Sequence, residues 1–583
     1  MRNRILVLAV IAVVLLAVLP TIIPQFWLPV FITFFLYSCW ALGWNVVMGY
    51  AGQLSLVQTL FVGAGVYVPG LLFMHYRLSP WIGMWGGIAL AVGIGAFLGF
   101  LCFRYKVKGV YFALASISLS QIGLAFVLTF KELGGGQEIF WPKTWEILDF
   151  QFRTNTPYYY VGLILLVGIM LVTYILKGSK LGYYFMALRD NEEAAQSLGV
   201  QSVKFKTYAV MLSGALTAIA GTFWGQYLGM ASAREQMGLG VLVILILCAQ
   251  LGGLGTVLGP VLGAALVVVL NTGIRWYMTL PPGITAAIYS GILVLAILFL
   301  PKGIIGLFPQ RLIGMNRTVI VKKDSTEAAK PASNPNPPKP KGETLLKVDN
   351  ASISFGGLMA VNNFSLEVKQ GEIVGLIGPN GAGKTTAFNL MTGFFEPTGG
   401  EITFEGKRLN GMRPDQIARL GLVRTFQIVH PFPDLSAAEN VMMGAFLHHG
   451  KTHEAEEKAM NALKTVGMAH RANTLARNLT LAEQRRLEIV RVLATQPKLI
   501  LLDEAMAGLT PTETHEAIEL ILKLRESGIT FLIVEHVMPI IMNLAERIVV
   551  MNLGAKMAEG TPEEVSKNQQ VIDAYLGEEA LLA

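Results

Sequence analysis

The sequence predicts a polytopic α-helical membrane domain fused to a soluble α/β domain with a phosphate-binding loop. Three observations indicate this fold class. Hydrophobic residues make up 53% of the 583 residues and charged residues only 15%, whereas soluble domains usually carry about 25% charged residues. Long apolar runs fill the first half of the chain, and the second half holds a strand, a glycine-rich loop and a helical run in direct succession.

Charge divides the chain in the same way. Residues 1–310 hold 17 Lys and Arg against 8 Asp and Glu, a net charge of +9, whereas the remainder holds 29 against 31, a net charge of −2. This pattern excludes a purely soluble enzyme, a disulfide scaffold and a disordered tail protein. It also argues against nucleic-acid binding, because the basic excess lies in the apolar half, where membrane topology explains it.

Ten apolar runs approach the roughly 20 residues that a helix needs to cross a bilayer. They are Ile5–Ile23, Leu28–Met48, Leu54–Met74, Trp81–Leu101, Gly109–Phe130, Tyr158–Leu176, Tyr208–Leu228, Leu239–Leu251, Val257–Ile274 and Ile284–Leu300. The run Leu239–Leu251 is short and ends in glycines, which is typical of a broken or re-entrant helix. We therefore expect about ten spans, or eight spans with half-helices.

Basic residues at the ends of the runs predict the orientation. Arg2 and Arg4, the loop 104–108, the loop 177–207, and Lys302 with Arg311 alternate correctly if the N-terminus is cytoplasmic. The first run resembles a signal peptide, but no cleavage site follows it, so we expect a retained helix. No Asp or Glu lies in the middle of a span, which argues against a proton-relay carrier.

A linker separates the two halves. Residues 311–343 include five prolines among Lys, Ser and Asn, a composition typical of an extended polar tether. The predicted domains are therefore a membrane domain over 1–310, the linker, and a soluble α/β domain over 344–583. We expect this linker to lie on the cytoplasmic side of the membrane.

The first motif of the second half that indicates chemistry is a predicted phosphate-binding loop. The strand Glu372–Ile377 is followed by Gly378-Pro379-Asn380-Gly381-Ala382-Gly383-Lys384-Thr385-Thr386 and then by a helical run. Glycines let backbone N–H groups close around phosphate oxygens, and a helix N-terminus adds positive potential. Lys384 is expected to reach the β- and γ-phosphates, and the Thr385 hydroxyl to reach Mg²⁺. The predicted phosphate-binding residues are Gly378, Asn380, Gly381, Gly383, Lys384, Thr385 and Thr386.

Two further strands end in polar residues. Lys498–Leu502 precedes Asp503 and Glu504, and Ile529–Glu535 precedes His536. At the carboxyl edge of a parallel sheet, Asp503 would approach the metal and Glu504 would polarise an attacking water. The sequence thus predicts a phosphate-binding site with Mg²⁺ and a carboxylate that activates water, and it places His536 beside the other two residues.

At this point the second half resembles the nucleotide-binding domain of ATP-binding cassette (ABC) transporters over 344–583. The resemblance implies that Phe355 stacks on adenine and that Gln427, in Arg424-Thr425-Phe426-Gln427, is a catalytic and metal-binding glutamine. It also makes His536 the switch histidine. Thr480 would bind the nucleotide of a partner ATPase.

The membrane half is similar to branched-chain amino acid permeases over about residues 30–310. The segments Asn45–Ser55 and Ala187–Gly199 carry this similarity. The cassette likewise resembles the first ATPase of the same uptake system. Glu192, Glu193 and Gly199 lie in the longest basic cytoplasmic loop, and the resemblance implies a coupling helix there that docks on the ATPase.

The signature motif departs from the Leu-Ser-Gly-Gly-Gln of the family. Here it reads Leu479-Thr480-Leu481-Ala482-Glu483. Thr480 keeps a hydroxyl, but side chains replace the glycines and Glu483 brings a negative charge near phosphate. We hypothesise that the chain hydrolyses ATP in its own loop while the site it completes for a partner is weak.

The predicted function is ATP-driven import of branched-chain or related amino acids by a multi-pass protein of the bacterial inner membrane. Expected partners are the solute, a second permease and a second ATPase or a second copy of this chain, and a periplasmic solute-binding protein, with no nucleic acid. Alternatives are an importer of urea, amides or other amino acids. Less favoured are an ABC exporter, which would use longer helices, and a membrane ATPase that transmits a mechanical signal.

Overall fold

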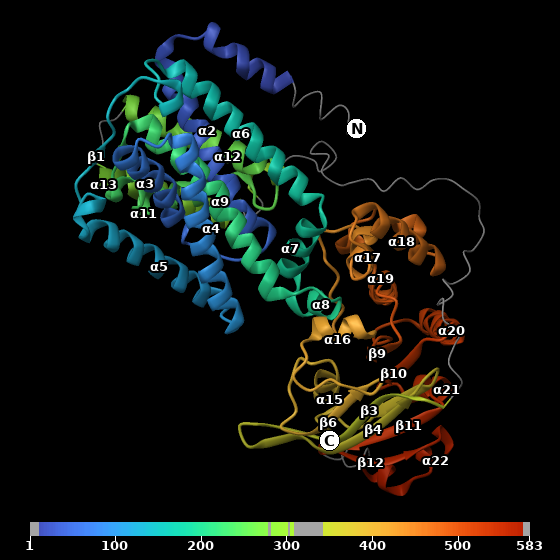
Figure 1. The fold of residues 1–583 in the computed structure, drawn as a ribbon. Helices are drawn as coiled ribbons and strands as arrows, with labels where there is room; N and C mark the ends of the chain where they lie inside the picture. The colour runs from blue at the N-terminus through green and yellow to red at the C-terminus, as the bar shows by residue number, and fades with distance from the viewer. Residues whose placement is uncertain (1–10, 278–281, 301–302, 308–341, 575–583) are drawn as a thin grey trace. The chain divides into compact units, whose positions relative to one another are not determined.

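The computed structural model describes residues 11–277, 282–300, 303–307 and 342–574 (Figure 1). The chain divides into two compact units, which we describe separately. The first comprises Met1–Arg189 and Ser202–Arg317, and the second comprises Asp190–Gln201 and Thr318–Ala583. The predicted linker 311–343 lies almost entirely outside the described residues. The predicted fold class, a helical membrane domain fused to an α/β domain, is confirmed.

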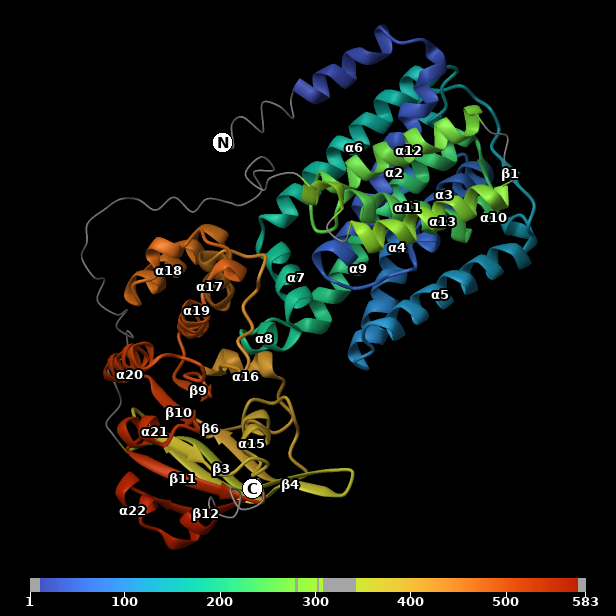
Figure 2. The same ribbon diagram turned by 180° about the vertical axis from the view of Figure 1, so that it is seen from behind.

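The first unit is helical (Figure 2). Its helices are α2 (Leu28–Asn45), α3 (Gln58–Tyr76), α4 (Pro80–Arg104), α5 (Val110–Thr129), α6 (Asn155–Lys177), α7 (Lys180–Asp190), α9 (Ser202–Leu228), α10 (Ala233–Gln236), α11 (Leu239–Gly252), α12 (Gly259–Tyr277) and α13 (Pro282–Phe299). The small strands β1 (Ile139–Phe140) and β2 (Met230–Ala231) pair antiparallel. Among the described residues, seven helices are long and apolar enough to cross a membrane, and Ile11–Thr21 and Gly259–Gly273 are shorter apolar helices. Each of the ten predicted runs therefore coincides with a helix, at least in part.

Glycines bring α3, α4 and α9 into close contact. A Cβ on Gly65 of α3 would lie 2.1 Å from the carbonyl oxygen of Ala218 on α9, and one on Gly221 would lie 2.6 Å from that of Val62. Only a residue without a side chain permits this approach, and close backbone packing replaces the hydrophobic force that is missing between helices in lipid.

A proline inside α3 leaves a backbone carbonyl without its helical donor. Pro69 has no N–H for the carbonyl of Gly65 one turn earlier. Thr222 of α9 supplies a donor instead, because its Oγ1 lies 2.8 Å from that oxygen. The hydroxyl of Thr222 on α9 therefore compensates for the N–H that Pro69 lacks in α3.

Thr222→Val should lower the unfolding free energy of the purified protein in detergent by about 1 kcal/mol, because Gly65 then keeps an unpaired carbonyl. Thr222→Ser retains the hydroxyl and serves as the control. In a Pro69→Ala background, which restores the helical N–H, the cost of Thr222→Val should shrink. An equal thermal shift for the Val and Ser variants would contradict this account.

Two helix breaks meet in the first unit. α2 passes into a π-helical turn, Val46–Tyr50, and α3 begins only at Gln58, later than the predicted start at Leu54. The second break follows α11 at Gly253. Asn45 joins them: its Nδ2 donates to Thr256 O at 2.8 Å, and its Oδ1 accepts from Gly255 N–H at 2.8 Å. The predicted break at the glycines after Leu251 is thus present, and side chains satisfy its backbone.

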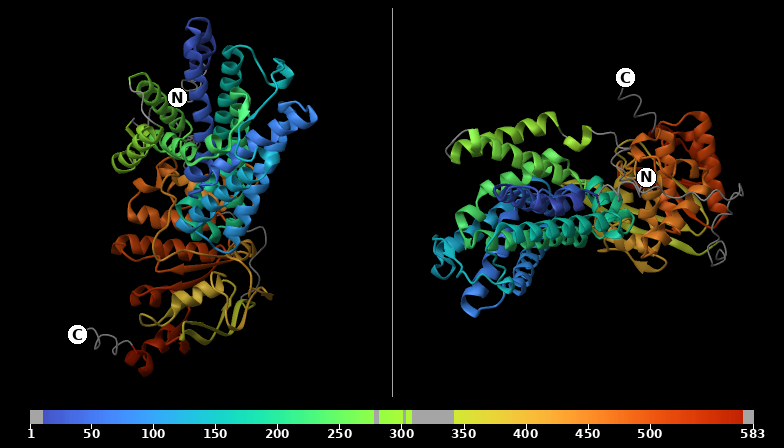
Figure 3. Two further views of the ribbon diagram at one scale, coloured as in Figure 1. Left: turned by 90° about the vertical axis from the view of Figure 1, so that its left-hand side faces the viewer. Right: turned by 90° about the horizontal axis from the view of Figure 1, so that it is seen from above.

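The second unit contains two sheets (Figure 3). Their strands, drawn in yellow and red, lie on one side of this unit, and the orange helices α17 to α19 lie on its other side. One sheet has the order β12-β11-β5-β10-β9-β8, and the other is antiparallel with the order β4-β3-β6-β7. The strands are β3 (Thr344–Phe355), β4 (Leu358–Lys369), β5 (Ile373–Ile377), β6 (Gly399–Phe404), β7 (Lys407–Arg408), β8 (Leu422–Arg424), β9 (Leu499–Asp503), β10 (Thr530–Val534), β11 (Arg547–Asn552) and β12 (Ala555–Gly560). Strands β5, β9 and β10 are fully buried and parallel, so their carboxyl ends share one edge.

The helices of the second unit flank these sheets. They are α8 (Glu192–Ser197), α15 (Lys384–Met391), α16 (Pro414–Leu420), α17 (Ala437–Ala445), α18 (Thr452–Thr465), α19 (Leu481–Leu493), α20 (Pro511–Glu526), α21 (Met538–Leu544) and α22 (Pro562–Ser566). α8 packs against α16. Gly199, at φ +86°, ends this segment so close to Leu447 that a Cβ would lie 2.3 Å from its Cδ1. The predicted coupling residues Glu192, Glu193 and Gly199 therefore belong to the compact unit of the nucleotide-binding half.

Candidate functional site

The phosphate loop connects the buried strand β5 to α15. α15 begins at Lys384, and in its first turn Thr385 is exposed and Thr386 is partly buried. Asn380 is exposed on the loop. The first N–H groups of a helix have no partner within the helix, so this end of α15 offers donors and positive potential to an anion.

Three glycines shape the loop. Gly378, Gly381 and Gly383 have φ values of +154°, +77° and +101°. A Cβ on Gly383 would lie 2.4 Å from the Ala360 carbonyl oxygen, and one on Gly378 would lie 2.0 Å from that of Met551. Gly381 instead faces open space. The loop is therefore held against neighbouring backbone at two glycines and left open at the third, as a phosphate cradle requires.

Lys384 is directed into this loop. Its side chain is buried, and its ammonium donates to the carbonyl oxygens of Gly378 at 2.7 Å and Pro379 at 2.9 Å. These contacts keep the positive charge within the loop that surrounds the phosphate position. A bound phosphate can take over part of this hydrogen bonding, because an ammonium has three donors.

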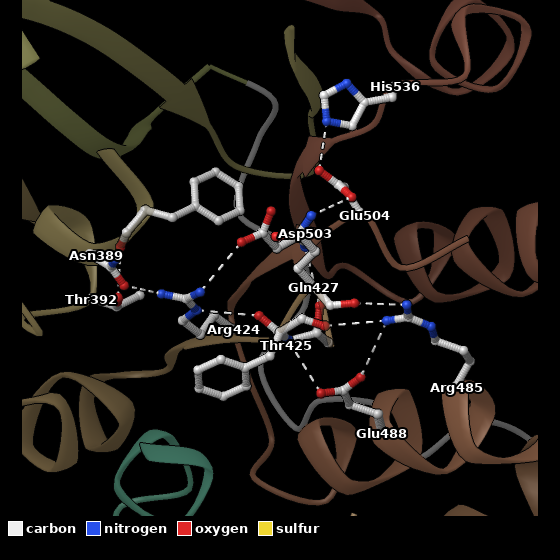
Figure 4. Close-up of polar contacts among 12 residues, drawn as sticks. Asn389, Thr392, Arg424, Thr425, Gln427, Arg485, Glu488, Asp503, Glu504 and His536 are labelled. Atoms are coloured by element: carbon white, nitrogen blue, oxygen red, sulfur yellow. Dashed lines mark hydrogen bonds and ion pairs between the residues drawn. The ribbon is translucent and has the colours of Figure 1, made fainter. Parts of the chain in front are cut away.

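Glu504, Gln427 and His536 converge although they come from distant parts of the chain (Figure 4). Gln427 Nε2 donates to Glu504 Oε2 at 2.8 Å, and His536 Nε2 lies 2.6 Å from Glu504 Oε1. Glu504 has φ +49°, an unusual backbone conformation for a non-glycine residue. Its N–H is fixed by the Val534 carbonyl oxygen at 2.9 Å. The Glu504 carboxylate is therefore held at both oxygens directly after β9.

Asp503 lies one residue earlier and is fully buried. Its Oδ2 is 3.4 Å from Arg424 Nη2, whereas its Oδ1 has no hydrogen-bond partner in the part of the chain that the structure describes. Burial raises the pKa of Asp503, while Arg424 opposes this shift and Glu504 adds to it. A buried carboxylate oxygen without a partner is what a divalent cation satisfies.

The donor set fits Mg²⁺. Magnesium is usually held by one or two carboxylates together with substrate phosphates and water. Asp503 offers a free oxygen, Thr385 offers an exposed hydroxyl, and Gln427 keeps its Oε1 while its Nε2 binds Glu504. No cluster of three His, Cys, Asp or Glu side chains suited to a metal occurs among the described residues.

Phe355 ends β3 at the hairpin before β4. The residue is 44% exposed, and its ring lies edge-on to Phe395 with centroids 5.2 Å apart. β4 also contributes Ala360, which borders the phosphate loop at Gly383. An exposed aromatic ring beside a phosphate loop can stack on a base.

The altered signature motif forms the N-terminal cap of α19. Thr480 caps α19: its Oγ1 accepts from Glu483 N–H at 3.3 Å, and its own N–H donates to Glu483 Oε2 at 2.9 Å. Glu483 also pairs with Arg471 at 2.7 Å. Although its partial burial acts in the opposite direction, these partners lower the pKa of Glu483. The Glu483 charge, predicted to lie near phosphate, is thus already paired within the chain.

The sequence interpretation missed a group of buried charges beside Gln427. Arg485 and Arg491 of α19 donate to the carbonyl oxygens of Gln427 at 2.8 Å and His430 at 2.7 Å. Glu488, between them on the helix, accepts from Phe426 N–H at 3.2 Å. The i, i+3 spacing of these three charges was the available signal, because it places them on one face of α19.

Family comparisons cover both halves. Residues 27–300 match the family described as branched-chain amino acid transport system / permease component. Residues 361–507 match the ABC transporter family, and residues 555–580 match the branched-chain amino acid ATP-binding cassette transporter family.

Curated relatives match the nucleotide-binding half. The high-affinity branched-chain amino acid transport ATP-binding protein LivG of Salmonella typhimurium is 47% identical over 252 residues, which cover 40% of this chain and 99% of the relative. The corresponding protein BraF of Pseudomonas aeruginosa is 43% identical over 250 residues, with 40% and 98% covered. A crystal structure of a nucleotide-free ATP-binding cassette from an ABC transporter is 30% identical, with 40% of this chain and 99% of that chain covered and a TM-score of 0.38.

Proposed function

The chain belongs to the ABC transporter family, and on this premise we propose that it imports branched-chain or related amino acids at the expense of ATP. One observation carries the proposal. A single polypeptide joins a match to the branched-chain amino acid permease family with an ABC-type ATPase that is 47% identical to LivG. The presence of permease and ATPase in one chain supports a subunit that both translocates and hydrolyses.

We assign the nucleotide site as follows. Lys384 and the loop residues Gly378, Asn380, Gly381, Gly383 and Thr386 bind the phosphates, and Phe355 stacks on adenine. Thr385, Asp503 and Gln427 hold Mg²⁺, which when bound neutralises charge on the phosphate oxygens. Thr480 contributes its hydroxyl to the nucleotide of the partner ATPase.

Hydrolysis depends on Glu504. Its carboxylate orients a water against the γ-phosphate and accepts a proton from it as the new P–O bond forms. His536 at 2.6 Å and Gln427 at 2.8 Å fix the two carboxylate oxygens in this orientation. The bond to the ADP oxygen breaks, and the proton leaves with the products.

The assembly follows from the composition of the chain. An ABC importer needs two membrane domains and two ATPases, and this chain provides one of each. We propose domains over 1–310 and 344–583 joined by the linker 311–343, with a second permease and ATPase, or a second copy, completing the transporter. A periplasmic binding protein delivers the solute. The protein lies in the bacterial inner membrane, with its N-terminus and its ATPase in the cytoplasm. Glu192, Glu193 and Gly199 couple ATP hydrolysis to transport.

Transport of labelled leucine tests the proposal. The transporter is purified through a tag on this chain and reconstituted into proteoliposomes loaded with ATP and Mg²⁺, with and without its binding protein. Accumulation that unlabelled isoleucine and valine suppress is expected. Accumulation of labelled urea or acetamide in the same vesicles, without accumulation of leucine, would assign another solute. Export, or ATP hydrolysis without any solute movement, would contradict the proposal.

A further inference from the structure

Arg424 occupies a buried position between three acceptors in the nucleotide-binding half (Figure 4). Its Nη1 donates to Asn389 Oδ1 on α15, its Nη2 lies 3.4 Å from Asp503 Oδ2, and its Nε donates to Thr425 O at 3.3 Å. Its guanidinium carbon lies 4.5 Å from the ring centroid of Phe426. The planar fork of arginine can meet these separate acceptors, whereas a lysine ammonium is a single point charge.

This arrangement assigns the two oxygens of Asp503 to different tasks. Arg424 takes Oδ2, and Oδ1 is left without a hydrogen-bond partner among the residues described. The Asp503 N–H donates to Thr425 Oγ1 at 3.3 Å, so the residue beside Arg424 also fixes the backbone. Partners of this kind orient a metal-holding carboxylate and determine which oxygen faces the metal.

Burial lowers the pKa of Arg424, and Asp503 is the first of the carboxylates that oppose this shift. The ion pair with Asp503 therefore also compensates for the burial of the arginine.

We infer that Arg424 is a positioning residue that holds Asp503 Oδ2 and thereby leaves Oδ1 available to Mg²⁺. The inference rests on the proposed role of Asp503 in the magnesium site. It adds to that site a residue of β8 that determines which oxygen of Asp503 the metal meets.

The first test measures metal affinity directly. The purified full-length chain is saturated with a non-hydrolysable ATP analogue, and Mn²⁺ binding is measured by electron paramagnetic resonance. Arg424→Lys should weaken Mn²⁺ binding about tenfold, the range typical for lost partners of metal-holding groups. Binding of a fluorescent ATP in EDTA should stay as in the wild type. Arg408→Lys, which changes an exposed arginine of the same half, is the matched control.

A second variant removes the guanidinium altogether. Arg424→Met should weaken Mn²⁺ binding at least as much as Arg424→Lys, because Asp503 Oδ2 then loses its ion-pair partner.

Each outcome decides between the alternatives. Wild-type Mn²⁺ affinity in Arg424→Lys, or loss of metal-free nucleotide binding in both Arg424 variants, would overturn a positioning role toward the metal. If the wild-type chain took up no Mn²⁺ with the nucleotide, the proposed magnesium site would fail, and the inference would fail with it.

Discussion

Glu504→Gln should reduce steady-state ATP turnover of the assembled transporter by at least about a hundredfold, the effect expected when a positioned general base is lost. The substitution keeps the shape of the side chain and its acceptor toward Gln427, but it removes the carboxylate that takes the proton from water. Nucleotide binding should persist, because Lys384 and the glycine loop lie outside the change. Phosphate release and binding of a fluorescent ATP are measured on the same preparation.

Two controls isolate the chemical step. Glu526→Gln removes an exposed carboxylate at the end of α20 and should leave turnover unchanged. His536→Ala should lower turnover less than Glu504→Gln, because it loosens the carboxylate at one oxygen and Gln427 still holds the other. Turnover near the wild-type rate in Glu504→Gln would show that hydrolysis takes place elsewhere in the assembly.

The altered signature motif predicts how ATP turnover is divided between the two sites of the assembly. Glu483 is committed to Thr480 and Arg471 in this chain, and Leu481 and Ala482 replace glycines that would allow a close approach to phosphate. We therefore expect the site that this chain completes for its partner to contribute little turnover. The equivalent substitution in the partner ATPase should then reduce the rate much less than Glu504→Gln does.

The convergence of the proposed catalytic residues was predictable because parallel strands impose it. Asp503 ends β9, His536 follows β10, and the register pairs Val534 with Asp503. Once both segments are recognised as parallel strands of one sheet, their carboxyl ends must lie side by side. The strand patterns in the sequence therefore determined which polar residues share an edge.

Arg424 was not predictable in the same way. Its partners Asn389 and Asp503 lie 35 and 79 residues away in the chain. No periodicity relates a strand residue to a helix residue and a second strand residue at such separations, and only side-chain packing shows that one guanidinium reaches both. The same holds for Asn45 and Gly255, 210 residues apart, whose contact joins the two helix breaks of the membrane unit.

Helix ends in the membrane unit were less predictable than the helices. Hydropathy located the apolar runs, but it does not distinguish a helix from a π-helical turn followed by extended chain, as at Val46 to Val57. Apolar residues continue through both conformations. The backbone there is satisfied by distant partners such as Ser116, whose Oγ accepts from Leu56 N–H at 2.8 Å, and such partners are not encoded locally.

Lys384→Ala should abolish ATP-dependent accumulation of labelled leucine in proteoliposomes and weaken ATP binding at least about tenfold. The buried ammonium is the positive charge inside the phosphate loop, and its removal leaves the carbonyl oxygens of Gly378 and Pro379 without their donor. Those oxygens then repel phosphate instead of being neutralised. Uptake and nucleotide affinity are measured together, and Lys407→Ala, at an exposed position on β7, is the control.

Lys384→Ala acts on ATP binding, the step that precedes hydrolysis. Glu504→Gln leaves ATP bound and halts the cycle after binding, whereas Lys384→Ala weakens the binding step itself. If ATP binding drives closure of the two ATPases and hydrolysis resets them, Glu504→Gln should hold the transporter closed and Lys384→Ala should hold it open. Cross-linking of the two ATPases in the presence of ATP separates these states. Leucine accumulation by Lys384→Ala at the wild-type rate, with no ATP consumed, would show that the membrane unit works without the energy of its own ATPase.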